Sequence, residues 1–220
     1  MKNNSKKKWC LGIIFISAFL LWTMLIQKVD VQPLGVKGTM IGFATINCWF
    51  HEITGVHMVI YHMTDWLGLV PVFTCMFLGV LGLMQWIKRR SIRKVDYDIL
   101  CLGIYYIVVI AAYLIFEMIP INYRPILIEG RMEISYPSST TLLVLCVMPT
   151  IIEQIKRRVK NGHVKMWLQS SVMVFSLFMV LGRLVCGVHW MTDIIGAIFF
   201  SCGWFHIYKA VVLWYDKTKN

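Results

Sequence analysis

The segment from Leu181 to Gly196 carries three side chains whose types and spacing suit nucleophilic chemistry. His189 and Asp193 are four residues apart, so on a helix they share one face and the carboxylate can orient the imidazole ring. Arg183 stands six residues before His189, and its planar guanidinium suits phosphate oxygens. Together they indicate an oriented imidazole that attacks phosphorus beside an anion-binding arginine. A buried ion pair between helices, without chemistry, is the alternative interpretation.

A second group of suitable residues lies in the segment 119–141. Arg124 presents a guanidinium next to a proline, which restricts the local backbone. Ser138, Ser139 and Thr140 follow another proline and open an apolar segment. At a helix N-terminus the free backbone N–H groups and the helix dipole form an anion site. The same hydroxyl residues are equally good N-caps without any ligand, so both interpretations stay open.

The composition indicates that membrane helices position these residues. The chain has 220 residues, of which 58% are hydrophobic, and this is not the composition of an ordinary soluble domain. About 20 apolar residues cross the roughly 30 Å hydrocarbon core of a bilayer. Six segments meet this requirement, near residues 9–27, 66–87, 97–119, 138–155, 166–184 and 190–214, although Pro149 and Glu153 interrupt the fourth. We expect an all-α, polytopic membrane protein with a single domain over residues 1–220.

Residues 41–62 predict one further helix, which would lie in the membrane interface. Its apolar residues recur on one helical face: Ile46, Trp49, Phe50, Ile53, Val56 and Ile60. Such a helix would guide a lipid towards the site or simply pack over the outer ends of the spans. Three histidines in this region, His51, His57 and His62, are spaced six and five apart and share no helical face. No metal site is therefore expected.

The basic residues that give the net charge of +11 are distributed around the predicted membrane spans and do not form a nucleic-acid-binding patch. Seventeen basic residues flank one side of the predicted spans, at both chain ends and in 88–94 and 156–165. Five lie on the other side: Lys28, Lys37, Arg124, Arg131 and Arg183. By the positive-inside rule both termini are cytoplasmic, and the segments with Arg124 and His189 face outward. The first span has no small-x-small cleavage site, so we expect an uncleaved anchor.

These residues resemble the pattern of the PAP2 superfamily, the type 2 phosphatidic acid phosphatases, whose fold is shared with vanadium-dependent haloperoxidases. The pattern reads KxxxxxxRP, PSGH and SRxxxxxHxxxD. Here its three parts stand as Glu117-x6-Arg124-Pro125, Pro137-Ser138-Ser139-Thr140 and Gly182-Arg183-x5-His189-x3-Asp193.

The resemblance implies a role for each matching position. His189 would attack phosphorus to give a phosphohistidine, and Asp193 would hold its ring. The phosphoryl oxygens would be bound by the following residues: Arg124, Arg183, Ser138, and the backbone N–H groups of Ser139 and Thr140. Water would then release phosphate. We expect no cofactor and no metal, and the expected partners are a membrane lipid phosphate and the lipid bilayer, without nucleic acid.

Two departures from the pattern affect the chemistry. Thr140 stands where the family has the histidine that protonates the leaving group, and Glu117 stands where it has a phosphate-binding lysine. A general acid contributes about 10²- to 10⁴-fold, and a lipid alkoxide needs its proton. A phosphate leaving group, with a second pKa of about 6, can leave without one. The threonine at position 140 therefore favours a diphosphate lipid as substrate. Glu117 is a candidate for the proton donor in place of the missing histidine.

The sequence predicts a membrane phosphatase acting at the outer face, on a lipid phosphate or preferentially on a lipid diphosphate such as a polyprenyl diphosphate. Two alternatives stay open. One is a transferase that passes a phosphoryl or headgroup from the same histidine to another acceptor. The other is a lipid-phosphate binder or transporter without catalysis.

Overall fold

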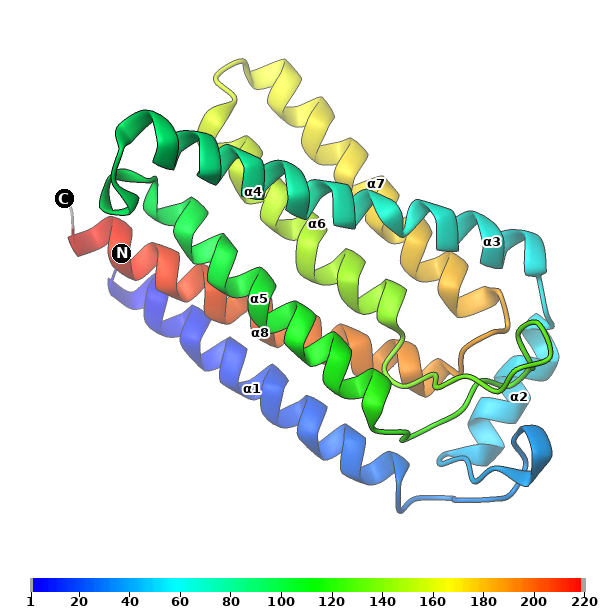
Figure 1. Cartoon of the computed structure of the whole chain (residues 1–220). Helices are drawn as coiled ribbons and strands as arrows, with labels where there is room; N and C mark the ends of the chain where they lie inside the picture. The colour runs from blue at the N-terminus through cyan, green and yellow to red at the C-terminus, as the bar shows by residue number, and fades with distance from the viewer. Residues whose placement is uncertain (1, 219–220) are drawn as a thin grey trace.

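The computed structural model describes residues 2–218, and its long elements are all helices (Figure 1). The six long helices are α1 (Lys2–Ile26), α4 (Leu69–Arg89), α5 (Tyr97–Met118), α6 (Ser139–Arg158), α7 (Gly162–Val185) and α8 (Met191–Thr218). The shorter ones are α2 (Ala44–Thr54) and α3 (Met58–Leu67), with 3-10 turns at Val36–Gly38 and Ile92–Lys94. The predicted all-α class is confirmed. Lys219, counted above with the C-terminal basic residues, lies outside the described residues.

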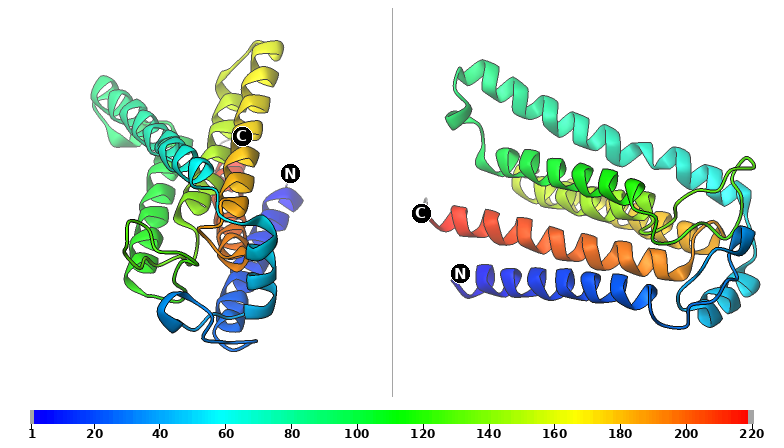
Figure 2. Two further views of the ribbon diagram at one scale, coloured as in Figure 1. Left: turned by 90° about the vertical axis from the view of Figure 1, so that its right-hand side faces the viewer. Right: turned by 60° about the horizontal axis from the view of Figure 1, so that its bottom comes forward.

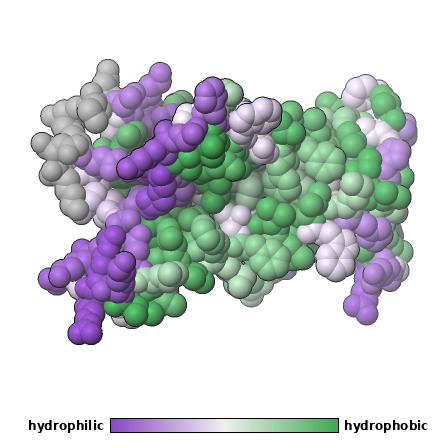
Figure 3. Space-filling view, turned by 90° about the horizontal axis from the view of Figure 1, so that it is seen from above, coloured by the Kyte–Doolittle hydropathy of each residue, from purple (hydrophilic) through white to green (hydrophobic). Residues whose placement is uncertain are grey.

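The surface of the bundle suits a bilayer. Six helical stretches of the described chain are long and apolar enough to cross a membrane. Figure 3 shows apolar side chains across the middle of the molecule and hydrophilic ones gathered at its two ends. Both termini lie at one end, and the α7–α8 turn lies at the other (Figures 1 and 2). The predicted polytopic membrane fold is therefore confirmed.

The fourth predicted span forms despite its polar interruptions, because α6 lies inside the bundle. It packs against α7 and α8 and has the largest buried share of the six spans. Glu153 accepts hydrogen bonds from Lys156 at 2.9 Å and from Lys209 of α8 at 2.8 Å. Pro149 is accommodated within the helix. The charge of Glu153 is thus neutralised by neighbours, which the sequence pattern alone does not reveal.

The expectation of one helix over residues 41–62 is wrong. α2 ends at Thr54, and Gly55 takes a positive φ of 68°, which turns the chain. α3 begins at Met58 and continues through Gly68 into α4, so the second span covers Met58–Arg89 and starts earlier than the predicted residues 66–87. Figures 1 and 2 show α3 and α4 as one rod at the edge of the bundle.

The interfacial position predicted for this region stays a prediction for α2. Its side chains Ile46, Trp49 and Ile53 are exposed, which leaves them free to contact acyl chains. On its other side Asn47 is buried and its amide donates to Thr192 Oγ1 at 3.0 Å. α2 is therefore fastened to the first turn of α8, directly beside His189 in the chain.

Candidate active site

The turn between α7 and α8 carries His189 and crosses the link between α2 and α3. Gly187 has a φ of 73°, and a Cβ atom there would overlap the carbonyl oxygen of Gly55. The backbone N–H of His57 donates to the carbonyl of Cys186 at 3.0 Å. This close backbone crossing requires glycine, and it brings α3 alongside the end of α7.

His189 is buried and faces Arg183 with one ring nitrogen and Asp193 with the other. Nε2 lies 3.5 Å from Nη2 of Arg183, and Nδ1 lies 3.7 Å from Oδ2 of Asp193. Because a guanidinium only donates hydrogen bonds, Nε2 must be the acceptor, and the proton of a neutral ring resides on Nδ1. The lone pair of Nε2 therefore points towards the arginine.

Burial lowers the pKa of His189 well below its ordinary value, and the positive charges of Arg183 and Arg124 lower it further. A contact with the backbone of Ser135 opposes these effects without cancelling them. The imidazole is thus neutral at physiological pH, which is the protonation state that a nitrogen nucleophile requires.

The carboxylate of Asp193 is fixed from two directions. Oδ1 accepts a hydrogen bond from the amide of Asn122 at 3.2 Å, and Oδ2 accepts one from the backbone N–H of Trp190 at 3.0 Å. The second contact closes the first turn of α8, and the first ties it to the segment before α6. Asp193 can therefore hold its position beside the imidazole.

The segment between α5 and α6 is a short hairpin that places Arg124 at the site. Tyr123 forms an isolated antiparallel bridge with Ile134, and the backbone N–H of Arg124 donates to the carbonyl of Glu133 at 3.0 Å. The indole N–H of Trp190 donates to the carbonyl of Tyr123 at 2.8 Å. The hairpin is thereby docked on the start of α8, with the Arg124 side chain turned inward and buried.

The two guanidinium groups lie against one aromatic ring. The Cζ atoms of Arg183 and Arg124 lie 5.0 Å and 5.7 Å from the ring centroid of Tyr61 on α3, within cation–π range. Arg183 also contacts Thr64 Oγ1 at 3.4 Å and Asp65 at 3.8 Å. Arg124 pairs with Glu133 through Nε at 3.1 Å.

These arginines retain buried donors without partners. Nη1 of Arg124 and Nε of Arg183 are buried and have no hydrogen-bond partner among the described residues. A buried charged donor without a partner is costly. An anion bound between the two side chains would satisfy both donors. The arrangement is therefore suited to a phosphoryl group in front of the His189 imidazole.

The start of α6 adds backbone donors to the same region. The backbone N–H of Ser138 donates to the carbonyl of Asp193 at 3.3 Å, and its hydroxyl donates to Thr141 Oγ1 at 3.1 Å. The Ser138 side chain makes no capping hydrogen bond to α6. Of the two interpretations left open by the sequence, the cap is not realised. The backbone N–H groups of Ser139 and Thr140 are free of that cap and remain candidates for binding an anion.

Residues 119–217 match the sequence profile of the PAP2 superfamily. Over this part of the chain, the sequence is similar to that superfamily. The match covers Arg124, Ser138, Arg183, His189 and Asp193 and confirms the resemblance stated above. No curated protein sequence matches the chain.

The fold is similar to that in "Crystal structure of the first transmembrane PAP2 type phosphatidylglycerolphosphate phosphatase from Bacillus subtilis". The TM-score is 0.63 at 15% sequence identity, and the alignment covers 96% of this chain and 98% of that one. The match to the PAP2 profile, together with this shared fold, supports a phosphatase of the hydrolase class.

The two positions that depart from the PAP2 pattern lie beside different hollows. Thr140 lines a mostly apolar cavity of about 510 Å³ between α4, α5 and α6, and Asp65 lines the same cavity. Glu117 is exposed and lines a small recess next to Ser135 and Pro137. Asp65, and not Glu117, is thus the carboxylate that shares the cavity with Thr140.

Two residues of this candidate site were not identified from the sequence. Asp65 carried a usable signal, since an acidic residue at the edge of an apolar segment is expensive and by default functional. Tyr61 carried no such signal, because an aromatic residue in a membrane helix is ordinary. Its role depends on the crossing of Gly55 and Gly187, which only the folded chain reveals.

Proposed function

We propose that this protein is a membrane lipid phosphatase in which Nε2 of His189 attacks the phosphorus of a lipid phosphate. The observation that carries the proposal is the pair of buried, partnerless donors of Arg124 and Arg183 beside a neutral imidazole. Both guanidinium groups would bind the phosphoryl oxygens and stabilise the negative charge of the transition state. Backbone N–H groups at the start of α6 would add to this stabilisation.

The reaction would proceed in two steps. In the first, the Nε2 lone pair forms a bond to phosphorus while the bond to the leaving oxygen breaks, and that oxygen departs with the electron pair. In the second, water attacks phosphorus, releases phosphate and returns the imidazole with its lone pair. Asp193 faces the Nδ1 proton and would stabilise the ring when it gains positive charge as a phosphohistidine.

The leaving group would occupy the cavity lined by Thr140 and Asp65. Its apolar walls, provided by α4, α5 and α6, suit the hydrocarbon chain of a lipid. Thr140 offers only a weakly acidic hydroxyl there, so a leaving group that needs no proton is favoured. We therefore propose a preference for lipid diphosphates, such as a polyprenyl diphosphate, over lipid monophosphates.

The site is proposed to face the outer side of the cell membrane, with both termini in the cytoplasm. The α7–α8 turn, which carries His189, lies at the end of the bundle opposite the termini (Figure 1), and the basic residues concentrate at the end with the termini. Single cysteines placed near Arg131 and near Lys160 test this orientation by labelling in intact cells. Labelling at 131 from outside is expected, and labelling only at 160 would reverse the proposed topology.

Phosphate release by the purified protein in detergent tests the proposed reaction. Polyprenyl diphosphate, phosphatidic acid and a soluble phosphate ester are supplied, and free phosphate is measured. His189→Ala should abolish release, and His163→Ala, at the exposed start of α7, should not. Binding of the lipids without release, unchanged by His189→Ala, would overturn the proposal in favour of a lipid-phosphate binder. Transfer of phosphate to an acceptor other than water would favour a transferase.

A further inference from the structure

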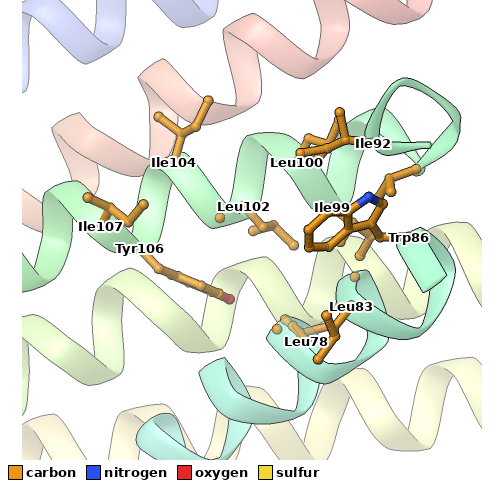
Figure 4. Close-up of a pocket in the computed structure, with 14 residues that line it drawn as sticks. Leu78, Leu83, Trp86, Ile92, Ile99, Leu100, Leu102, Ile104, Tyr106 and Ile107 are labelled. Carbon is orange, nitrogen blue, oxygen red and sulfur yellow. The ribbon is translucent and has the colours of Figure 1, made fainter. Parts of the chain in front are cut away.

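A further hollow lies far from His189, between α4 and α5 near the end that holds the chain termini. It has a volume of about 390 Å³ and apolar walls. Figure 4 shows Trp86 at the end nearest the 3-10 turn at Ile92–Lys94, and Tyr106 at the other end. Its lining includes Leu78, Leu83, Trp86, Ile99, Leu102 and Ile107. We call this hollow the α4–α5 groove.

Two glycines keep the groove open to the hydrocarbon. A Cβ atom at Gly79 or at Gly103 would meet no heavy atom within 4 Å, so larger side chains would project into free space. Both residues line the groove, as does the exposed Ile104. The α4–α5 groove therefore faces the lipid, and its width depends on the absence of side chains at Gly79 and Gly103.

The groove adjoins a polar pocket of about 960 Å³, since Val95 and Leu100 line both. Four ion pairs lie in this pocket: Arg89–Asp96 at 2.8 Å, Arg158–Asp98 at 2.9 Å, Arg158–Asp96 at 3.7 Å and Arg157–Asp216 at 2.6 Å.

Arg93 and Lys94 line the same pocket, and no carboxylate pairs with either of them within residues 2–218. Every aspartate that lines the pocket is already paired with an arginine. The pocket therefore has two cationic side chains that no carboxylate neutralises, directly beside the α4–α5 groove.

We propose that this composite site binds one anionic phospholipid from the membrane leaflet at this end of the bundle. An acyl chain would lie in the α4–α5 groove, and the phosphate would lie between Arg93 and Lys94. Basic pockets at the membrane surface attract anionic headgroups, and the apolar extension selects a lipid over a soluble anion. The occupant is a diester such as phosphatidylglycerol, which a phosphatase does not hydrolyse.

Native mass spectrometry of the full-length protein in detergent tests the site. The protein carries His189→Ala, and dioleoyl phosphatidylglycerol and dioleoyl phosphatidylcholine are titrated separately. The protein should bind the first phosphatidylglycerol more tightly than the first phosphatidylcholine. Replacing both Arg93→Gln and Lys94→Gln should weaken phosphatidylglycerol binding about thirtyfold and leave phosphatidylcholine unchanged.

Two sets of variants separate the groove from general charge and hydrophobicity. Gly79→Leu with Gly103→Leu should weaken binding of both lipids, while Ala111→Leu, elsewhere on the exposed surface of α5, should not. Lys88→Gln with Arg90→Gln removes the same charge from the same region but not from the pocket, and it should have little effect.

Equal binding of the two lipids would overturn the proposal, and so would equal losses from the 93/94 and 88/90 pairs. Unchanged lipid binding by the variant with Gly79→Leu and Gly103→Leu would also overturn the proposal. Arg183→Ala, which damages the proposed phosphatase site, should leave lipid binding intact, so failure of the two proposals can be told apart.

Discussion

Asp65 Oδ1 lies 3.8 Å from Nη1 of Arg183, so a carboxylate from α3 stands against the buried guanidinium that is proposed to bind phosphate. Asp65 is more than half exposed, whereas Arg183 is almost fully buried. A phosphoryl group would bind to the same guanidinium and would be repelled by this carboxylate. Asp65 therefore competes with the substrate unless it moves when the substrate binds.

Replacing Asp65→Asn should tighten binding of phosphate-like inhibitors. The change removes one negative charge and keeps the size of the side chain. Because Asp65 is exposed to solvent, which screens its charge, its interaction with Arg183 is worth at most about 1 kcal/mol. The inhibition constant of vanadate should therefore fall about two- to fivefold. Glu129→Gln, in the exposed turn of the hairpin, is the matched control. A large fall in kcat with unchanged vanadate inhibition would instead make Asp65 a participant in proton transfer.

The aromatic ring of Tyr61 should support anion binding through the two arginines. Tyr61→Phe keeps the ring and should leave vanadate inhibition within about twofold of the wild type, since the ring face provides the attraction. Tyr61→Leu removes the ring and should raise the inhibition constant roughly three- to thirtyfold. Thermal unfolding in detergent checks that both variants fold. Equal effects of the two substitutions would assign the role to the hydroxyl and not to the ring.

The helical part of the fold and one half of the site follow from local sequence patterns. The spacing of four between His189 and Asp193 indicated their proximity, although His189 lies in the turn before α8 and not on the helix itself. The spans could be located because apolar runs of sufficient length form membrane helices.

The other half of the site could not be predicted, because it depends on long-range contacts. Tyr61 reaches Arg183 only because Gly55 and Gly187 allow two backbones to cross. Arg124 is turned inward by a hairpin that a search for regular strands and helices does not reveal. The break of the predicted interfacial helix at Gly55 has the same origin, since the link there must reach the α7–α8 turn.

The activity should persist at more acidic pH than an ordinary histidine nucleophile would allow. The pKa of His189 is lowered, so the ring remains neutral as the pH falls through about 6.5, the value for an unperturbed histidine. The acid limb of kcat/KM should lie below that value for two substrates with different phosphate pKa values. An acid limb that shifts with the phosphate pKa of the substrate would report the ionisation of the substrate and not that of His189. A limb near 6.5 common to both substrates would contradict the lowered pKa.

The lowered pKa of His189 should also make the stability of the folded protein depend on pH. The unfolded chain binds a proton at His189 at about pH 6.5, whereas the folded chain binds it only at lower pH. The free energy of unfolding should therefore decrease as the pH falls below about 6.5. His189→Asn should weaken this dependence.

The crossing of Gly187 and Gly55 should be more sensitive to substitution than other turns. Gly187→Ala combines a positive φ with a direct overlap with the Gly55 carbonyl, so it should destabilise the protein and separate α3 from Arg183. Gly130→Ala is the matched control, because Gly130 has a φ of 76° and open space around it. That control should cost only the backbone strain of about 1–2 kcal/mol. Similar unfolding temperatures for the two variants would show that the crossing tolerates a side chain.

Restoring a general acid with Thr140→His should raise the turnover of lipid monophosphates more than that of lipid diphosphates. The cavity that Thr140 lines has a volume of about 510 Å³, which leaves room for an imidazole. A positioned acid contributes about 10²- to 10⁴-fold, but only where the leaving oxygen needs a proton. We expect kcat to rise at least about tenfold for phosphatidic acid and to change little for a polyprenyl diphosphate. Thr140→Asn adds a polar side chain without a usable proton and should not raise kcat for phosphatidic acid. An equal rise for both substrates would refute the leaving-group argument, because the imidazole would then act by binding phosphate and not by donating a proton.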